Sequence, residues 1–277
     1  MLKNINIEFF GNISSYNLFI GLGIISGVLY YNYKNKNLSD NYKFKIYNLL
    51  FISFIFGFIG SRVFDIIFFN KSFNIDNFLY GSSTYMGGLL FSLISIKVIS
   101  FILKINFFSI FNSLIPFILI SHFFGRIGCF LSGCCFGKES HENYLFGVTF
   151  PEGSIPYSFY GKQTEIHPTQ LYESFFLIII FFLLKNKKNM ITPYLIFYGI
   201  IRFFIEFYRN DPRGETIFNI ISPSQFLSLI FILIGLIVYY LNYNKRIILN
   251  DIEIVTWKSG VYKLYYYFLT LCLFSFL

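Results

Sequence analysis

The sequence predicts an all-α integral membrane protein, a polytopic helical bundle of about seven spans. Of its 277 residues 55% are hydrophobic and only 13% are charged, with a mean hydropathy of +0.60, whereas soluble domains carry about 25% charged residues. The net charge of +8 would suggest a nucleic-acid partner in a soluble protein. Here loop lysines that orient membrane helices explain it, so we expect membrane lipid and no nucleic acid around this chain.

Seven apolar stretches approach the length of about 20 residues that a helix needs to cross the hydrocarbon core. No small-residue cleavage site follows the first stretch, so we interpret it as a retained span and not as a signal peptide. We expect one transmembrane domain over 1–249 and a hydrophobic tail over 250–277, which either lies along the interface or adds an eighth helix from Val261 to Leu277. The seven stretches are 16–33, 46–69, 84–103, 107–125, 169–184, 191–208 and 222–243.

Lysines between the stretches predict the orientation, because basic loops stay on the cytoplasmic side. Every second loop is basic, whereas the intervening loops carry acidic residues among their bases. The N-terminus and the long 126–168 segment are therefore expected outside the cytoplasmic membrane. The basic loops contain Lys34, Lys36, Lys43 and Lys45, then Lys104, then Lys185, Lys187 and Lys188, then Lys245 and Arg246; the others contain Glu139, Glu142, Glu152 and Glu165, then Asp211 and Glu215.

Charged residues inside the apolar stretches are costly, about 2.5 to 3.5 kcal/mol each, and indicate function or ion pairing. Arg62 and Asp65 are three residues apart, and Arg202 and Glu206 are four apart, so each pair can neutralise itself on one helix face. For Arg62 and Asp65, a structural ion pair or snorkelling to the interface is as well supported as a functional role.

Arg126 and Glu173 have no neighbour of opposite sign in their own segments. Arg126 lies in the string GRIGCFLSGCCFG at 125–137, whose glycines permit a broken helix that directs backbone N–H groups at an anion. Two outward-facing arginines, Arg126 and Arg202, next to glycine-rich turns predict a pocket for an anion such as a lipid phosphate.

Several motifs together resemble one bacterial family, the prolipoprotein diacylglyceryl transferases. The resemblance covers nearly the whole chain up to about residue 245, and short motifs on several separate spans make it specific. Its elements are GFIGSRVF at 57–64, YMGGLL at 85–90, GRIGCFLSGCCFG at 125–137, HPTQLYES at 167–174, YGIIRFFIEFYR at 198–209 and ISPSQFLSL at 221–229.

The resemblance implies transfer of the diacylglyceryl group of phosphatidylglycerol to the lipobox cysteine of prolipoprotein signal peptides, in the bacterial inner membrane. It implies that Arg126 binds the headgroup, that Arg202 assists the leaving group with Glu206 orienting it, and that Glu173 lies at the outer mouth of a cavity. Such a reaction needs a base for the thiol and cations for the phosphate. The remaining substrate-binding candidates are Gly87, Gly88, Arg62 and Gly133.

The sequence departs from the family where the general base is expected. The family's histidine before the paired glycines is Met86 here, and two asparagines and a glutamate of its signature are Cys129, Ser132 and Cys134. His122 precedes Arg126 by four residues, so on a continuous helix it would share the arginine's face and could act as the base. A packed histidine bonded to a nearby carbonyl is the alternative.

Two other histidines are weaker candidates for the base. His167 opens the HPTQ motif beside Pro168, where capping and orienting that segment is the favoured role. His141 is typical of an exposed loop residue.

The cysteines Cys129, Cys134 and Cys135 leave three interpretations open: packing as small buried residues, a structural disulfide, or redox chemistry. Their C-x₄-C-C spacing matches no standard zinc pattern, so we expect no metal and no cofactor. We expect Cys272 to act as a small hydrophobic residue. Besides the transferase, the residues allow a lipid-binding homologue without catalysis or a membrane thiol oxidoreductase.

Overall fold

The computed structural model describes residues 4–7, 11–68, 72–80, 85–141, 144–211 and 221–244. The chain folds into two compact units. The first contains Met1–Lys34 and Asn112–Leu249, and the second contains Asn35–Phe111. The predicted tail over 250–277 lies outside the described residues, and so does Cys272.

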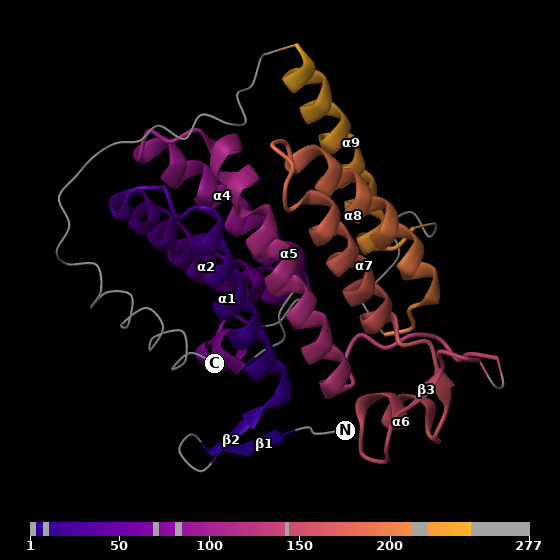
Figure 1. The fold of residues 1–277 in the computed structure, drawn as a ribbon. Coiled ribbons are helices and arrows are strands. Elements are labelled where there is room, and N and C mark those ends of the chain that lie inside the picture. Colours follow the sequence, from indigo (N-terminus) through magenta and orange to yellow (C-terminus); the bar gives the residue numbers. More distant parts are fainter. Residues whose placement is uncertain are drawn as a thin grey trace. The chain divides into compact units, whose positions relative to one another are not determined.

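Helices occupy every one of the seven predicted stretches (Figure 1). Within the described residues four of them are long and apolar enough to cross a membrane, and 87–102 and 169–184 are shorter apolar helices. The protein is therefore a polytopic helical membrane protein. The bounds are α1 Ser15–Lys34, α2 Asp40–Phe68, α4 Tyr85–Ile102, α5 Phe107–Ser132, α7 Thr169–Leu184, α8 Ile191–Ile205 and α9 Pro223–Tyr243.

The helix α5 differs from the prediction, because it continues past Gly125 to Ser132. The expected break in the glycine-rich string does not occur within the helix. Gly128 instead lets α5 pack closely against α1, since a Cβ there would lie 3.2 Å from the carbonyl oxygen of Tyr16 in α1. The chain turns only at Gly133, whose φ of +73° favours glycine. Arg126 and Cys129 therefore both lie on regular helix.

Small residues bring the helices of the first unit together. A Cβ on Gly199 of α8 would lie 2.8 Å from the carbonyl oxygen of Ser228 in α9, and one on Gly235 of α9 would lie 2.8 Å from Cγ1 of Ile196. The helix α9 begins with a capping box in which Ser222 and Gln225 bond each other's backbone. Close backbone approach of this kind is how membrane helices associate where lipid supplies no hydrophobic driving force.

One end of the first unit is fastened by the basic loops. Nζ of Lys34, at the end of α1, donates to the carbonyl of Lys185 at 2.7 Å. Near the start of α5, the amide of Asn112 donates to the carbonyl of Lys188 at 2.7 Å, and its Oδ1 accepts from the backbone N–H of Met190 at 2.7 Å. Two loops expected to share the cytoplasmic side thus lie at one end.

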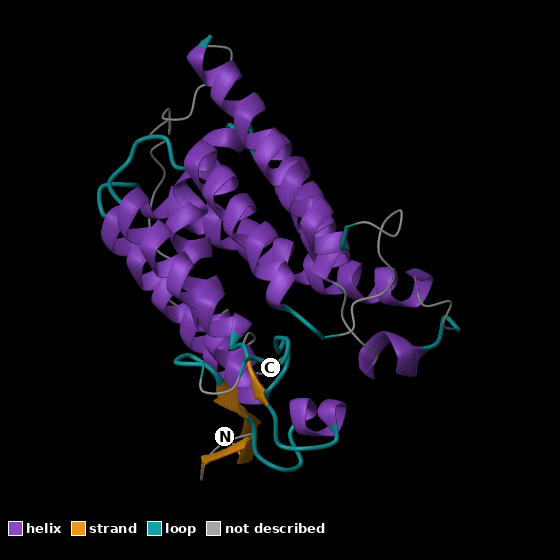
Figure 2. Ribbon diagram, turned by 90° about the vertical axis from the view of Figure 1, so that its right-hand side faces the viewer, coloured by secondary structure: helices purple, strands orange, loops and turns teal. Residues whose placement is uncertain are grey.

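The opposite end carries the small strands and the turns that follow α5 and α8 (Figure 2). The backbone of Lys138 donates to the carbonyl of Tyr208 at 2.7 Å, which joins the two turns. Two small two-stranded antiparallel sheets are additions to the all-α prediction. Their strands are β1 Asn4–Ile7 with β2 Gly11–Ser14, and β3 Val148–Thr149 with β4 Glu165–Ile166; the helix α6 Ile155–Tyr160 and the 3₁₀ turn Glu206–Tyr208 complete this end.

The second unit is built on the contact between α2 and α4, with the short helix α3 (Ile75–Tyr80) between them in sequence. Gly60 and Gly87 face each other, because a Cβ on Gly60 would lie 2.5 Å from the carbonyl oxygen of Gly87. Oγ of Ser92 donates to the carbonyl of Ser53 at 3.0 Å across the same contact. The glycine of this pair in α4 therefore has a packing role that the sequence alone did not reveal.

Candidate active site

The carboxylate of Glu173 is the centre of a buried polar cluster in the first unit. Its side chain is fully buried on the first turns of α7. Oε1 accepts a hydrogen bond from the phenol of Tyr198 in α8 at 3.0 Å, and it lies 2.9 Å from Nη2 of Arg126 in α5. Three helices thus converge on one carboxylate. The side chain of Glu173 is fully buried, and its expected place at the outer mouth of a cavity stays a prediction.

His122 completes this cluster from the turn of α5 before Arg126. Nε of Arg126 donates to Nε2 of His122 at 3.2 Å, which confirms that the two residues share a helix face. A guanidinium has no lone pair to offer, so Nε2 accepts and the imidazole is neutral in this arrangement. Nε2 also lies 3.3 Å from Oε1 of Glu173, which is ready to accept a hydrogen bond if the ring gains a proton.

A second ion-paired cluster lies at the end of α8. Nη2 of Arg202 lies 2.6 Å from Oε2 of Glu206, which confirms the predicted pair, and Oγ of Ser222 donates to Oε1 of Glu206 at 2.9 Å. Arg209 holds Asp211 through Nε and Nη2, at 2.9 and 2.8 Å from Oδ1. Arg202 is also close enough to Glu173 to interact with it electrostatically, so the two clusters are neighbours.

Two guanidinium nitrogens of this second cluster are buried donors for which the described residues supply no hydrogen-bond acceptor. They are Nη1 of Arg202 and Nη1 of Arg209, and both arginines are at least nine-tenths buried. A buried donor without an acceptor costs about 1 to 3 kcal/mol, and more for a charged group. An anion with several oxygens would satisfy both. Sequence reasoning missed Arg209, although it ends the quoted string YGIIRFFIEFYR, because a residue just past a helix end resembles an interface charge.

The glycine-rich string ends in a tight turn that gathers the three cysteines. Gly133 and Cys135 both have a positive φ, of 73° and 63°. Oγ1 of Thr169 donates to the carbonyl of Cys135 at 2.9 Å, and Nε2 of Gln170 donates to that of Cys134 at 2.6 Å. None of the three cysteines forms a disulfide. The HPTQ motif thus holds this turn against the start of α7, a role that sequence reasoning did not assign.

The electrostatic surroundings of this turn favour an ionised thiol. Hydrogen bonds with the thiols of Cys129 and Cys134, and then the positive charges of Arg209 and Arg126, lower the pKa of Cys135. Cys129 is buried and the other two are half-buried. The cluster therefore has an accessible side.

His167 positions the turn and does not cap α7. Its backbone N–H donates to the carbonyl of Lys138 at 2.9 Å, and its Nδ1 lies 3.1 Å from the phenol oxygen of Tyr172. The expected cap is absent, since Pro168 is the N-cap residue of α7 and no side-chain hydrogen bond caps the helix. Burial, and then the nearby His141, lowers the pKa of His167.

The remaining sequence candidates make contacts within their own units. Arg62 lies in the second unit, with its guanidinium 5.1 Å from the centre of the Phe58 ring. Gly87 and Gly88 pack α4 against α2 in the same unit. Gly133 belongs to the cysteine turn, where Pro156 Cδ would lie 3.2 Å from an added Cβ. Their assignment to substrate binding stays a prediction.

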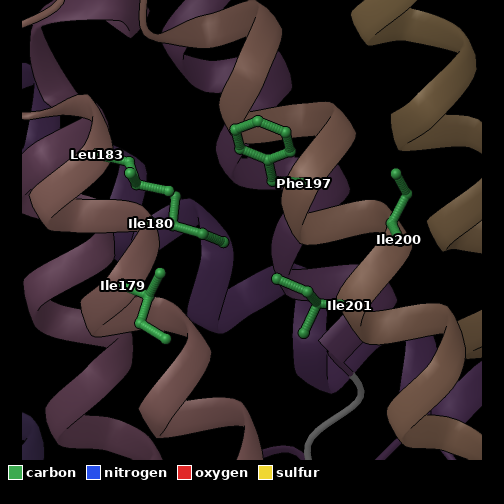
Figure 3. A pocket seen from close by; sticks show the side chains of 6 residues that line it. All are labelled: Ile179, Ile180, Leu183, Phe197, Ile200 and Ile201. Carbon is green, nitrogen blue, oxygen red and sulfur yellow. The ribbon is translucent and has the colours of Figure 1, made fainter.

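An apolar groove of about 210 Å³ runs between α7 and α8. Figure 3 shows that only aliphatic and aromatic side chains line it, from both helices. Ile180 follows Glu173 by two turns of α7, about 10 Å along the axis. The groove therefore lies below the polar cluster in the direction of the basic loops. Its lining is Ile179, Ile180, Leu183, Phe197, Ile200 and Ile201.

Comparison with known proteins decides the family. Residues 4–241 match the family described as prolipoprotein diacylglyceryl transferase. This chain belongs to the prolipoprotein diacylglyceryl transferase family. The resemblance predicted from the motifs is confirmed, and the match spans both polar clusters and the cysteine turn.

Relatives from several bacteria agree with this assignment. The chain is 35% identical over 251 residues to a phosphatidylglycerol–prolipoprotein diacylglyceryl transferase 2 of Clostridium perfringens, covering 86% of this chain and 94% of the relative. It is 33% identical to the transferase of Clostridium tetani, covering 86% and 97%. A transferase of Buchnera aphidicola is 35% identical over 240 residues, covering 76% and 85%. The protein is thus a multi-pass membrane protein of a transferase family.

Proposed function

We propose that this protein transfers the diacylglyceryl group of phosphatidylglycerol to the lipobox cysteine of prolipoproteins. The observation that carries the proposal is the pair of buried donors, Nη1 of Arg202 and Nη1 of Arg209, beside the cluster of His122, Arg126 and Glu173. Family membership supports it. The product of the reaction is a thioether, which begins lipoprotein lipidation.

The reaction needs positively charged groups beside the phosphate that leaves. The thiolate attacks the glyceryl carbon, a C–S bond forms, and the C–O bond to phosphate breaks with its electron pair passing to oxygen. The phosphodiester carries one negative charge, and the glycerol phosphate that leaves carries up to two. Arg202 and Arg209 would hold this growing charge, and Glu206 fixes Arg202 through the 2.6 Å ion pair. Arg126 would hold the headgroup from the neighbouring cluster.

His122 is the base in this proposal. Its Nε2 carries the lone pair that now accepts from Arg126, and it is 3.3 Å from Glu173. On taking the thiol proton, the ring would exchange Arg126 for Glu173 as its partner. Glu173 would then stabilise the imidazolium as the carboxylate of a catalytic triad does. Arg126 would thereby lose its hydrogen bond to His122, and its guanidinium could bind the phosphate in the same step.

The apolar groove between α7 and α8 would take an acyl chain. It contains no polar atom in its lining and lies along the same two helices that carry Glu173 and Arg202. A lipid whose phosphate is held by the arginines has acyl chains that extend into the hydrocarbon core. The groove offers them a fixed path, which would align the glyceryl carbon for attack.

The orientation expected from the loop charges fits this function. With the basic loops cytoplasmic, the glycine-rich end of α5 faces the outside of the bacterial inner membrane, where exported prolipoproteins emerge. Lys34 and Lys185, which lie together at the other end of the unit, would then be cytoplasmic. The active site would open to the outer leaflet.

The proposal is tested with purified protein, phosphatidylglycerol vesicles and a lipobox peptide, by measuring released glycerol phosphate. Release that equals thioether formed, and that stops when phosphatidylethanolamine replaces phosphatidylglycerol, is the expected result. Phosphatidylglycerol bound without release would identify a lipid-binding homologue instead. Disulfide exchange on the peptide without release would identify a thiol oxidoreductase.

A further inference from the structure

The three cysteines of the glycine-rich turn form a cluster that no step of the proposed reaction uses. Their Sγ atoms all lie within 4.8 Å of one another. Four-coordinate zinc with Zn–S bonds of about 2.3 Å needs sulfurs about 3.8 Å apart. Cys129, Cys134 and Cys135 therefore lie close enough together to share one zinc ion. The expectation of no metal rested only on the spacing of the cysteines in the sequence. The left-handed turn at Cys135 brings the three sulfurs together although that spacing matches no standard zinc pattern.

Resting on the proposed function, we propose that Cys129, Cys134 and Cys135 bind Zn²⁺ as three thiolates and leave the fourth position open for the lipobox cysteine. Zinc sites with three protein ligands and an open position are the catalytic type, whereas closed four-ligand sites are structural. Among the described residues, this group of possible metal ligands contains three members and no fourth. A substrate thiol would complete the tetrahedron.

Buried hydrogen bonds fix the backbone of the cysteine cluster. Zinc ligands are usually fixed by hydrogen bonds from neighbouring residues. Here Thr169 and Gln170, both fully buried, hold the carbonyls of Cys135 and Cys134 from the start of α7. Cys129 is buried whereas the other two cysteines are half-buried, so the metal would be anchored inside and reachable from one side.

The location of the cluster suits the reaction. Cys129 follows Arg126 by three residues on α5, a rise of about 4.5 Å. An isolated bridge between Gly137 and Arg209 brings the second arginine cluster to the end of the same turn. A thiol bound at the metal would therefore approach a phosphate held by Arg126 and Arg209. Nucleophile and leaving group must meet at one carbon in this way.

The zinc would supply the activation that the sequence lacks at Met86. A thiol that coordinates zinc gives up its proton, for which a neutral imidazole or a water is a sufficient acceptor. The sulfur electron pair then forms the C–S bond, and the C–O pair leaves with the phosphate. Zinc stays divalent throughout and no oxidant or reductant is needed. The thioether, a weaker ligand, dissociates and the next thiol binds.

The test uses Co²⁺ in place of zinc in the full-length protein carrying Cys272→Ser, which removes the cysteine outside the cluster. We expect one equivalent of Co²⁺ with the intense visible bands of a tetrahedral thiolate complex, and displacement by one equivalent of Zn²⁺. A lipobox peptide with cysteine should shift these bands, and the same peptide with serine should not. Cys129→Ser, Cys134→Ser and Cys135→Ser should each lose the spectrum, and Ser132→Ala should keep it.

Several results would overturn the zinc site. They are a cobalt spectrum that survives replacement of all three cysteines, a disulfide between two of them in protein purified without reductant, or no response to the cysteine peptide. Selective binding of Cu⁺ with exclusion of Zn²⁺ would also overturn it.

Transfer activity separates this proposal from the proposed function. Removing zinc with a chelator should lower the rate of transfer about 100-fold, as expected when activation of a nucleophile is lost, and zinc should restore it. Full activity without metal would leave the transferase standing and remove the zinc. A cobalt spectrum that responds to the peptide, in a protein that transfers nothing in any metal state, would keep the zinc site and remove the transferase.

Discussion

Arg126 and Glu173 form a buried ion pair between α5 and α7, with Nη2 of the arginine 2.9 Å from Oε1 of the carboxylate. Each is a charge that its own helix leaves unneutralised, so the pair makes the two helices dependent on each other. Because His122 and Tyr198 contact the same oxygen, the pair also defines the geometry of the candidate active site.

Glu173→Gln should destabilise the protein and reduce transfer. The substitution leaves the guanidinium of Arg126 buried without its counter-charge, and breaking a buried pair costs about 3 to 5 kcal/mol. Thermal unfolding in detergent measures the loss, with Glu152→Gln, an exposed carboxylate on the turn before α6, as the matched control. An unchanged unfolding temperature for Glu173→Gln would contradict the role of the pair.

Arg202→Ala should lower the rate of transfer about 100- to 1,000-fold, the size found when one donor to a developing anion is removed. Binding of phosphatidylglycerol should weaken less, since the charge to be stabilised grows only as the phosphate leaves. Kinetics over a range of lipid concentrations separate the two effects. Lys162→Ala, an exposed cation near the same end of the unit, is the control. Equal losses in binding and rate would assign Arg202 to binding alone.

Gly137→Ala should unfold at lower temperature than the parent. An added Cβ would collide with the carbonyl oxygen of His167 and lie 2.8 Å from that of Tyr208. The carbonyl of Tyr208 joins the turns after α5 and α8 by accepting from the backbone N–H of Lys138. Gly125→Ala is the matched control, because nothing lies within 4 Å of its added Cβ and alanine favours helix by about 1 kcal/mol. Equal unfolding temperatures for the two variants would show that the turns can separate without cost.

Ile201→Trp should raise the phosphatidylglycerol concentration needed for half-maximal rate by filling the groove between α7 and α8. Phe175→Trp adds a similar bulk on an exposed part of α7 that does not line the groove, and it should leave that concentration unchanged. Short-chain phosphatidylglycerol should be less affected than long-chain lipid in Ile201→Trp. If all chain lengths are affected equally, the groove does not hold an acyl chain.

Acid should destabilise the protein partly through His167. Its pKa is lowered by burial and then by His141. The unfolded chain therefore binds the proton first, so the contribution of His167 is present above its unfolded pKa of about 6.5 and is lost as the pH falls below it. Between about pH 7.5 and pH 5, the unfolding temperature of His167→Gln should fall less than that of the parent protein. Equal losses would show that His167 does not titrate in this window.

The helices could be predicted from the sequence because long apolar runs must be helical in lipid. The end of α5 could not, since Gly125 and Gly128 look like helix breakers until the contact between Gly128 and Tyr16 is seen. The pair of Arg202 and Glu206 was predictable from its spacing of four residues. The pair of Arg126 and Glu173 joins two helices, and one sequence carries no signal for it.

The structure of the cysteine turn could not be predicted from the sequence either. Spacing in the sequence describes which residues share a helix face, whereas the positive φ angles at Gly133 and Cys135 fold the chain back on α5. Thr169 and Gln170 belong to the HPTQ motif, but their hydrogen bonds to the turn depend on how α7 packs. Arg209 was overlooked for a similar reason, since its place beside Glu206 follows from the 3₁₀ turn at the end of α8.

The transfer reaction is measured most directly by the mass of a lipobox peptide after incubation with the purified protein and phosphatidylglycerol. A diacylglyceryl increment on the cysteine peptide, absent from the serine peptide and absent with Arg126→Ala, is the predicted result. An unmodified cysteine peptide, with the protein folded and phosphatidylglycerol bound, would show a lipid-binding protein without transfer.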